Sequence, residues 1–311
     1  MASGPGGQEP ARRPGPSPAW LIVMATFLFA TMGVCVKLAS AQYTAGEMVL
    51  YRSLTGTLMI FAWSRWQGVK LATTMPAAHF WRSLSGVVSL VLWFYAIGNL
   101  PLATAMTLNY MSSVWMALFL LGGAALLGTG RIDGRLIGTV LLGFCGVALV
   151  LRPTIEQDQL WHGLIGLLSG MIAATAYLQV TALGRAGEPE ERIVFYFSAS
   201  GIAAGLLTTL WTGLSTHSWK GAALLLAIGV LATLAQLMMT RAYSTGRTLV
   251  NASLQYLGIA YSFAYGVLLF GDRITWRALT GMLLIVAAGL AATLLRSKAL
   301  PADTAKPPTE S

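Results

Sequence analysis

The sequence predicts an all-α, polytopic membrane protein with ten transmembrane helices. Of its 311 residues, 56% are hydrophobic and only 10% are charged, whereas about a quarter of the residues in soluble domains are charged. A folded surface in water needs polar cover, so this composition argues against a soluble enzyme, a disordered chain or a disulfide scaffold. The apolar residues also form long unbroken runs, such as 224–239, and do not alternate as in a membrane β-barrel.

Ten apolar segments lie between two polar ends of the chain. Each segment is close to the roughly 20 residues that a helix needs to cross the hydrocarbon core of a bilayer. Residues 1–18 and 297–311 are rich in Gly, Pro and polar side chains and are expected to be disordered cytoplasmic tails. The predicted helices are 20–38, 46–64, 82–100, 103–127, 135–151, 162–183, 192–213, 221–242, 249–270 and 277–295.

The first apolar segment also has features of a secretory signal peptide. Two arginines precede it, and Ala39-Ser40-Ala41 resembles a cleavage site. However, Ala30-Thr31 of this segment has a counterpart, Ala174-Thr175, far along the chain. A segment that is repeated inside the chain is not a cleaved signal, so we expect residues 20–38 to form a mature helix.

The repeat divides the chain into two five-helix halves, residues 19–152 and 160–296. Five is an odd number, so the second half must cross the membrane in the opposite sense to the first. Inverted repeats of this kind are typical of secondary transporters. The further matched positions are Val49-Leu50-Tyr51 with Ile193-Val194-Phe195, Ala96, Leu108 and Tyr110 with Ala242, Leu254 and Tyr256, and Arg131-Ile132 and Arg135 with Arg273-Ile274 and Arg277.

Positive charges indicate which ends of the helices face the cytoplasm. With the N-terminus inside, the cytoplasmic set is Arg12, Arg13, Arg65, Lys70, Arg82, Arg131, Arg135, Arg185, Arg192, Arg241, Arg247, Arg296, Lys298 and Lys306. The opposite set is Lys37, Arg52, Arg152, Lys220, Arg273 and Arg277. This excess predicts a multi-pass protein of the cytoplasmic (inner) membrane with both termini in the cytoplasm. It also accounts for the net charge of +9 without a nucleic-acid partner.

Short motifs recur at the ends of both halves. They are Leu268-Leu269-Phe270-Gly271-Asp272-Arg273-Ile274-Thr275 with Gly281 and Gly289, and their counterpart Arg131-Ile132 with Gly138, Gly143 and Gly146. Two further motifs lie inside the first half, namely the turn Leu100–Ala105 and Tyr51-Arg52-Ser53 of the second helix. In order, spacing and duplication, they resemble the EamA-type branch of the drug/metabolite transporter superfamily. The resemblance covers nearly the whole chain outside the tails. It implies alternating access around a central cavity between two pseudo-symmetric bundles, without ATP hydrolysis.

The sequence holds no recognisable catalytic or metal-binding motif. Walker A, HExxH and GxSxG sequences are absent, and the two cysteines, Cys35 and Cys145, lie in apolar segments. His79, His162 and His217 fall in predicted loops or at helix ends, whereas a zinc site needs converging ligands. We therefore expect neither an enzyme nor a bound cofactor or metal.

Arg52 is the charged residue that lies deepest in a predicted helix. Lipid solvates charge poorly, so such residues usually face a cavity or a partner. Arg52 is therefore predicted to hold an anionic group of a substrate or to form a gating contact. The alternative is that it reaches the interface or bonds the carbonyls of a neighbouring helix. Lys37 and Glu47 flank the short loop between the first two helices, where a structural ion pair is expected.

Polar side chains form stripes on several predicted helices. An amide that faced lipid would lack hydrogen-bond partners, so these stripes should point inward. They either line a cavity or only bond one helix to another. With nearby aromatic residues, the predicted substrate-binding set is Arg52, Trp93, Tyr95, Asn109, Tyr110, Thr175, Gln179, Tyr196, Gln236, Asn251, Gln255 and Tyr256.

Together these features predict a secondary transporter, embedded in the lipid bilayer, for a small polar metabolite such as an amino acid or an organic anion. An integral-membrane enzyme acting on a lipid or lipid-linked substrate is the alternative, and would need clustered His, Asp, Glu or Ser at one membrane face. A non-transporting subunit or sensor is a third interpretation. The spacings Gly134–Gly138, Gly166–Gly170 and Gly201–Gly205 allow close helix approach and are consistent with a weak homodimer.

Overall fold

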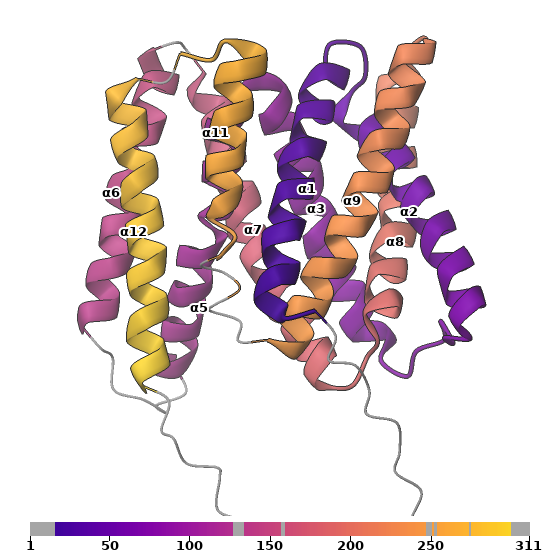
Figure 1. Cartoon of the computed structure of the whole chain (residues 1–311), viewed down its shortest axis with the longest axis horizontal. Helices are drawn as coiled ribbons and strands as arrows, with labels where there is room; N and C mark the ends of the chain where they lie inside the picture. The colour runs from indigo at the N-terminus through magenta and orange to yellow at the C-terminus, as the bar shows by residue number, and fades with distance from the viewer. Residues whose placement is uncertain are drawn as a thin grey trace, which may run out of the picture.

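The structure is a computed structural model that describes residues 16–126, 134–156, 159–246, 251, 254–273 and 275–299. Over these ranges the chain forms helices and connecting turns, with no β-strand, and the helices stand side by side in one bundle (Figure 1). They are α1 (Pro18–Ala39), α2 (Ala45–Gln67), α3 (Pro76–Asn99), α4 (Leu102–Tyr110), α5 (Ser112–Leu126), α6 (Gly134–Glu156), α7 (Leu160–Arg185), α8 (Glu190–Thr212), α9 (Trp219–Thr245), α11 (Leu257–Phe270) and α12 (Trp276–Ala299). Most of the two predicted tails lies outside the described residues, and so do Arg131-Ile132 and Arg247.

Five of the described helices, α1, α3, α7, α8 and α9, are long and apolar enough to cross a membrane. Large apolar side chains stay exposed on the outside of the bundle, including Leu210, Trp211, Trp219 and Trp276. Soluble monomers rarely expose apolar surface on this scale. The fold is that of an all-helical protein suited to lipid, which confirms the predicted fold class at this level.

The ends of α2 and α3 decide where two arginines lie. A capping box starts α2, because Thr44 Oγ1 accepts from the Glu47 amide at 3.2 Å and the Glu47 carboxylate accepts from the Thr44 amide at 3.4 Å. This places Arg52 about two turns into the helix. Pro76 begins α3 six residues before the predicted start, since proline suits the first helical position. Arg82, which the sequence placed with the cytoplasmic loop charges, is therefore inside a helix, and it is buried.

The predicted ion pair between Lys37 and Glu47 is wrong. Lys37 Nζ donates to the carbonyl oxygen of Leu100 at 2.5 Å. The Glu47 carboxylate instead accepts from Ser215, in the segment between α8 and α9. A carboxylate held by several hydrogen-bond donors is satisfied without a cation, so proximity along the sequence did not decide the partner.

The predicted helix 103–127 is interrupted in the structure. It divides at Met111 into α4 and α5, where the amide of Val114 donates to the carbonyl oxygen of Met111 in a tight, i to i+3 turn. A similar turn precedes α11, where the amide of Gly258 donates to the carbonyl oxygen of Gln255. Discontinuous helices of this kind build binding sites in many transporters.

The helices pack in recurring pairs. α1 lies against α9, α3 against α7, α2 against α8, and α6 against α12. Figure 1 shows α6 and α12 side by side at one edge of the bundle, away from α2 and α8. Glycines permit close approaches of α8 to α2 and of α7 to α4: a Cβ on Gly205 would lie 2.6 Å from Leu50 Cα, and one on Gly170 would lie 2.5 Å from the carbonyl oxygen of Leu108. These glycines, which suggested a dimer, therefore serve packing within the chain.

Candidate substrate-binding site

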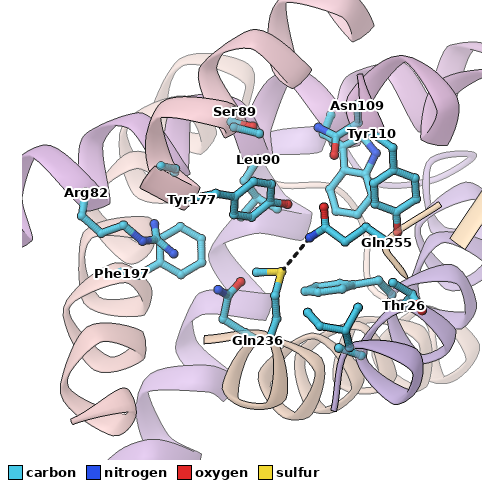
Figure 2. Close-up of a pocket in the computed structure, with 18 of the residues that line it drawn as sticks. Thr26, Arg82, Ser89, Leu90, Asn109, Tyr110, Tyr177, Phe197, Gln236 and Gln255 are labelled. Atoms are coloured by element: carbon cyan, nitrogen blue, oxygen red, sulfur yellow. Dashed lines mark hydrogen bonds between the residues drawn. The ribbon is translucent and has the colours of Figure 1, made fainter. Parts of the chain in front are cut away.

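A cavity lies in the middle of the bundle, between helices from both halves of the chain (Figure 2). Its free volume is about 60 Å³, which is room for a few water molecules. A metabolite therefore enters only if side chains or helices move. The cavity is lined by Ile22, Ala25, Thr26 and Phe29 of α1, Arg52 of α2, Arg82, Gly86, Ser89, Leu90 and Trp93 of α3, Asn109 and Tyr110 of α4, Ala173, Ala176 and Tyr177 of α7, Phe197 of α8, Gln236 and Met239 of α9, and Gln255.

Half of the predicted substrate-binding set meets at this cavity. These residues come from four helices and one turn, and the sequence related them only through charge, polar stripes and aromatic content. They are Arg52, Trp93, Asn109, Tyr110, Gln236 and Gln255.

The other predicted residues have partners elsewhere in the bundle. Gln179 Oε1 accepts from the Ser85 hydroxyl at 2.7 Å, and the Thr175 hydroxyl donates to the carbonyl oxygen of Ile172 at 2.8 Å. Tyr196 packs its ring against His79.

Three more predicted residues also lie away from the cavity. Tyr95 packs against His162, and Asn251 donates to the carbonyl oxygen of Ala242. Tyr256 is buried at the turn before α11. None of these six side chains lines the cavity of this conformation, and their part in binding stays a prediction.

Two buried arginines converge on one aromatic ring. The guanidinium carbon of Arg52 lies 5.0 Å from the centroid of the Phe197 ring, and that of Arg82 lies 4.4 Å from it. Figure 2 shows the Arg82 guanidinium over this ring at one side of the cavity. Arg52 and Arg82 are only 3% and 2% exposed. Contact with the ring face offsets part of the cost of burying each charge.

Neither arginine has an acidic partner in the part of the chain that the structure describes. No residue lining the cavity is acidic. Nε of Arg52 and both Nε and Nη1 of Arg82 are buried without a hydrogen-bond partner. Two unit charges about 10 Å apart repel by roughly 2 kcal/mol at an effective dielectric constant of about 20. The site therefore combines hydrogen-bond donors that have no acceptor with positive charge that has no counter-charge. A bound anion would supply both the acceptor and the negative charge.

The opposite side of the cavity is polar but uncharged. Asn109 Nδ2 donates to Ser169 Oγ at 3.0 Å, and Gln255 Nε2 contacts the Met239 sulfur at 3.5 Å, the contact drawn in Figure 2. Gln255 Oε1, Tyr110 Oη and Trp93 Nε1 are buried without partners. Buried polar atoms normally have partners, so these atoms are available to a bound molecule.

Comparisons with known proteins identify the family of this chain. A family model described as the EamA-like transporter family matches residues 16–152. The chain is 33% identical over 275 residues to the pseudopaline exporter CntI of Pseudomonas aeruginosa, across 87% of this chain and 94% of CntI. The chain belongs to the EamA-like transporter family. This confirms the resemblance read from the sequence motifs.

Two further similarities extend over most of this EamA protein. An uncharacterized transporter of Helicobacter pylori is 24% identical over 278 residues, across 87% of this chain and 92% of the relative. A solved structure aligns with a TM-score of 0.66 over 91% of this chain and 98% of its own, at 16% identity, and supports the fold alone. Because its relatives are transporters, this EamA protein is a multi-pass membrane transporter of a small molecule and not an enzyme.

Sequence reasoning missed three prominent cavity residues of this EamA protein: Arg82, Tyr177 and Phe197. A signal for Arg82 was present, because Arg82, Gly86 and Trp93 lie on one face of a helix at spacings of four and seven. Extending the third helix backward along that face would have included Arg82. Phe197 had no such signal, because its neighbour Tyr196 is the more polar of the two and packs elsewhere.

Proposed function

We propose that this EamA protein is a secondary transporter that moves a small organic anion by alternating access around the central cavity. The observation that carries the proposal is Arg52, which lines the cavity, is buried and has no acidic partner in the described part of the chain. A permanently buried, uncompensated cation is costly unless its environment supplies an anion during the working cycle.

The packing of the helices supports the proposed inverted repeat, with halves 19–152 and 160–296. Under the repeat, α1 corresponds to α7, α3 to α9, α2 to α8 and α6 to α12. The contact of α1 with α9 then becomes the contact of α7 with α3, while α2 with α8 and α6 with α12 map onto themselves. The interruptions at Met111 and at Gln255-Tyr256 fall at similar places in the two halves. This symmetry supports ten membrane crossings that rock about a central site.

We further propose that the protein lies in the cytoplasmic membrane with both termini inside. Positive charge supports this orientation, and Figure 1 shows α1 beginning and α12 ending at the same end of the bundle. The likeness to CntI, which is named as an exporter, supports export as the direction. Cysteines introduced at Ala41 and at Ala186 should react with impermeant reagents from opposite sides. Labelling of both from one side would contradict the topology.

Flux into proteoliposomes tests the transport function. The purified protein is reconstituted and assayed with labelled glutamate, glutamine, succinate and phosphate. We expect uptake of at least one anion, and a loss of about tenfold or more in Arg52→Gln, because a buried contact to a charged group is removed. Arg65→Gln, at the exposed end of the same helix, is the matched control and should transport normally. Equal flux in wild type and Arg52→Gln would refute the anion site, and the absence of flux for every probe would count against the function.

A further inference from the structure

The position of Arg82 depends on a glycine one turn further along α3. A Cβ at Gly86 would collide with Arg82 Nη1 and would lie 2.9 Å from the Phe197 ring. The Arg82 side chain therefore runs along its own helix toward the cavity, over a place that only a glycine leaves open. The same glycine brings the Phe197 ring close to α3. The contact of Arg82 with Phe197 at the cavity wall thus depends on the glycine at position 86.

Arg52 reaches the same ring from a different helix. It lies in the third turn from the start of α2 and Arg82 in the second turn from the start of α3, and α2 and α3 are consecutive helices that run in opposite directions (Figure 1). Each guanidinium carbon lies within 5.0 Å of the ring centroid. Two full positive charges are thus gathered around one side chain. Four acidic side chains of the described residues, Glu47, Glu188, Glu190 and Asp272, are engaged with other partners.

We infer that the cavity selects a dianion, whose two negative charges are matched by Arg52 and Arg82. A monovalent anion would neutralise only one of the two guanidinium groups and would leave the other buried and uncompensated. Two carboxylates on one small molecule, or one doubly charged phosphate, would compensate both and would satisfy the free Nε and Nη1 donors. This inference rests on the transport function proposed above and names the charge of its substrate.

The uncharged side of the cavity fits the remainder of such a molecule. Asn109, Tyr110 and Gln255 lie across from Arg82 and Phe197 (Figure 2). These side chains offer hydrogen bonds and aromatic surface but no counter-charge for the anionic groups. The dianionic part would therefore lie at the side of the two arginines, and the uncharged part at the other side.

Binding of matched probes to the purified, detergent-solubilised protein tests the charge preference. Succinate and butyrate have four carbons each and differ in the number of carboxylates, and inorganic phosphate distinguishes a single dianionic group from two separate carboxylates. Affinity is measured at pH 7.5 by calorimetry and by thermal stabilisation. We expect succinate or phosphate to bind at least about tenfold more tightly than butyrate, and this advantage to fall as salt is raised.

Three variants test whether Arg52 and Arg82 cause the preference for dianions. In Arg52→Gln and in Arg82→Gln, the advantage of the dianion over butyrate should shrink to less than about threefold. Gly86→Ala keeps both charges and displaces Arg82 or Phe197, so it should weaken the dianion selectively. Arg185→Gln removes an exposed charge at the end of α7 and should leave the preference unchanged. Arg82→Met also removes the charge and keeps an apolar contact with Phe197, and it is the replacement should Arg82→Gln fail to fold.

The outcomes separate this inference from the transport function. Wild type that binds butyrate as well as succinate and phosphate, or that binds none of the three, overturns the dianion site. So does a preference that survives in Arg82→Gln. Charge-dependent binding without flux in vesicles would instead reject transport and keep the site. Flux of neutral solutes with no charge preference would keep transport and reject the site.

Discussion

Different side-chain interactions hold the two ends of the bundle together, although one buried glutamate is central to each set. At one end, Glu47 joins the start of α2 to the segment between α8 and α9. At the other end, Glu188 joins the turn between α7 and α8 to the segment between α2 and α3. Each glutamate thus connects the two halves of the chain. They differ in the groups that donate to them.

Glu47 is held by uncharged donors. Its carboxylate accepts from the amide of Ser215 at 3.0 Å and from the hydroxyl of Ser215 at 2.5 Å, and it also completes the capping box of α2. Nearby, Tyr51 Oη and His217 Nε2 lie 2.7 Å apart. In the described part of the chain no cation pairs with Glu47.

Glu188 is held by charged and polar donors together. Arg192 Nη1 donates to it at 2.9 Å, Thr73 Oγ1 at 2.8 Å, and His79 Nε2 lies 3.2 Å away. Arg192 also donates to the carbonyl oxygen of Lys70 at 2.7 Å. Burial alone would raise the pKa of Glu188, but the hydrogen bonds from Thr73, Arg192 and His79 and the charge of Arg192 bring it below its ordinary value of 4.5.

The comparison indicates that the two ends differ in strength. Breaking hydrogen bonds between neutral donors and a carboxylate costs less free energy of unfolding than removing one partner of a buried ion pair. In an alternating-access cycle the two ends open in turn. The end at Glu188 is then expected to be the harder one to open, and substitutions at the two ends test this.

The largest effect is expected from Glu188→Ala. This change removes the acceptor of His79 Nε2 and the carboxylate partner of Arg192, which is only partly exposed and keeps only its bonds to the carbonyl oxygen of Lys70. The free energy of unfolding should fall by about 2–3 kcal/mol, somewhat below the cost of breaking a fully buried pair. Thermal melting of the purified protein measures it. A variant as stable as wild type would show that the ion pair does not hold this end.

A smaller effect is expected from Glu47→Gln. The amide keeps the size of the side chain and one acceptor for Ser215, but the hydrogen bonds lose the assistance of charge. The free energy of unfolding should fall by about 1–2 kcal/mol. The same melting assay compares it with Glu188→Gln, and the comparison above is wrong if the Glu47 variant is the less stable of the two.

Acidification should weaken the interactions of Glu188. Because the pKa of Glu188 is lower in the folded protein than its ordinary value, its stabilisation is present above that value and is lost as the pH falls through the folded pKa. The difference in melting temperature between wild type and Glu188→Gln should therefore shrink as the pH falls below about 4. A difference that stays constant down to pH 3 would exclude this linkage.

The smallest effects concern single hydroxyl groups. Thr73→Val removes one donor to Glu188 and should lower the free energy of unfolding by about 1 kcal/mol. Tyr51→Phe removes the exposed hydroxyl that lies near His217 and should change it by less than about 0.5 kcal/mol. If both variants lose the same free energy of unfolding, the hydroxyl groups at the two ends contribute equally, and the expected difference between the ends is wrong for these groups.

The sequence by itself determined the class of protein and its family. Long apolar runs can be stable only as helices in lipid, because each helix satisfies its own backbone hydrogen bonds. The motifs at the ends of the halves predicted the EamA resemblance, which the comparisons confirm. Depth within a helix singled out Arg52, since a charge there is costly enough to need a cavity or a partner.

The tertiary structure alone decided which side chains meet. Arg82 reached the cavity because α3 begins at Pro76, and helix starts are the least certain part of a sequence reading. Phe197 lines the cavity while Tyr196 packs on His79, because adjacent residues on a helix point about 100° apart. Helical periodicity defines the faces of one helix. Which neighbour covers each face depends on the packing of all the helices together, and this is what brought two arginines to one ring.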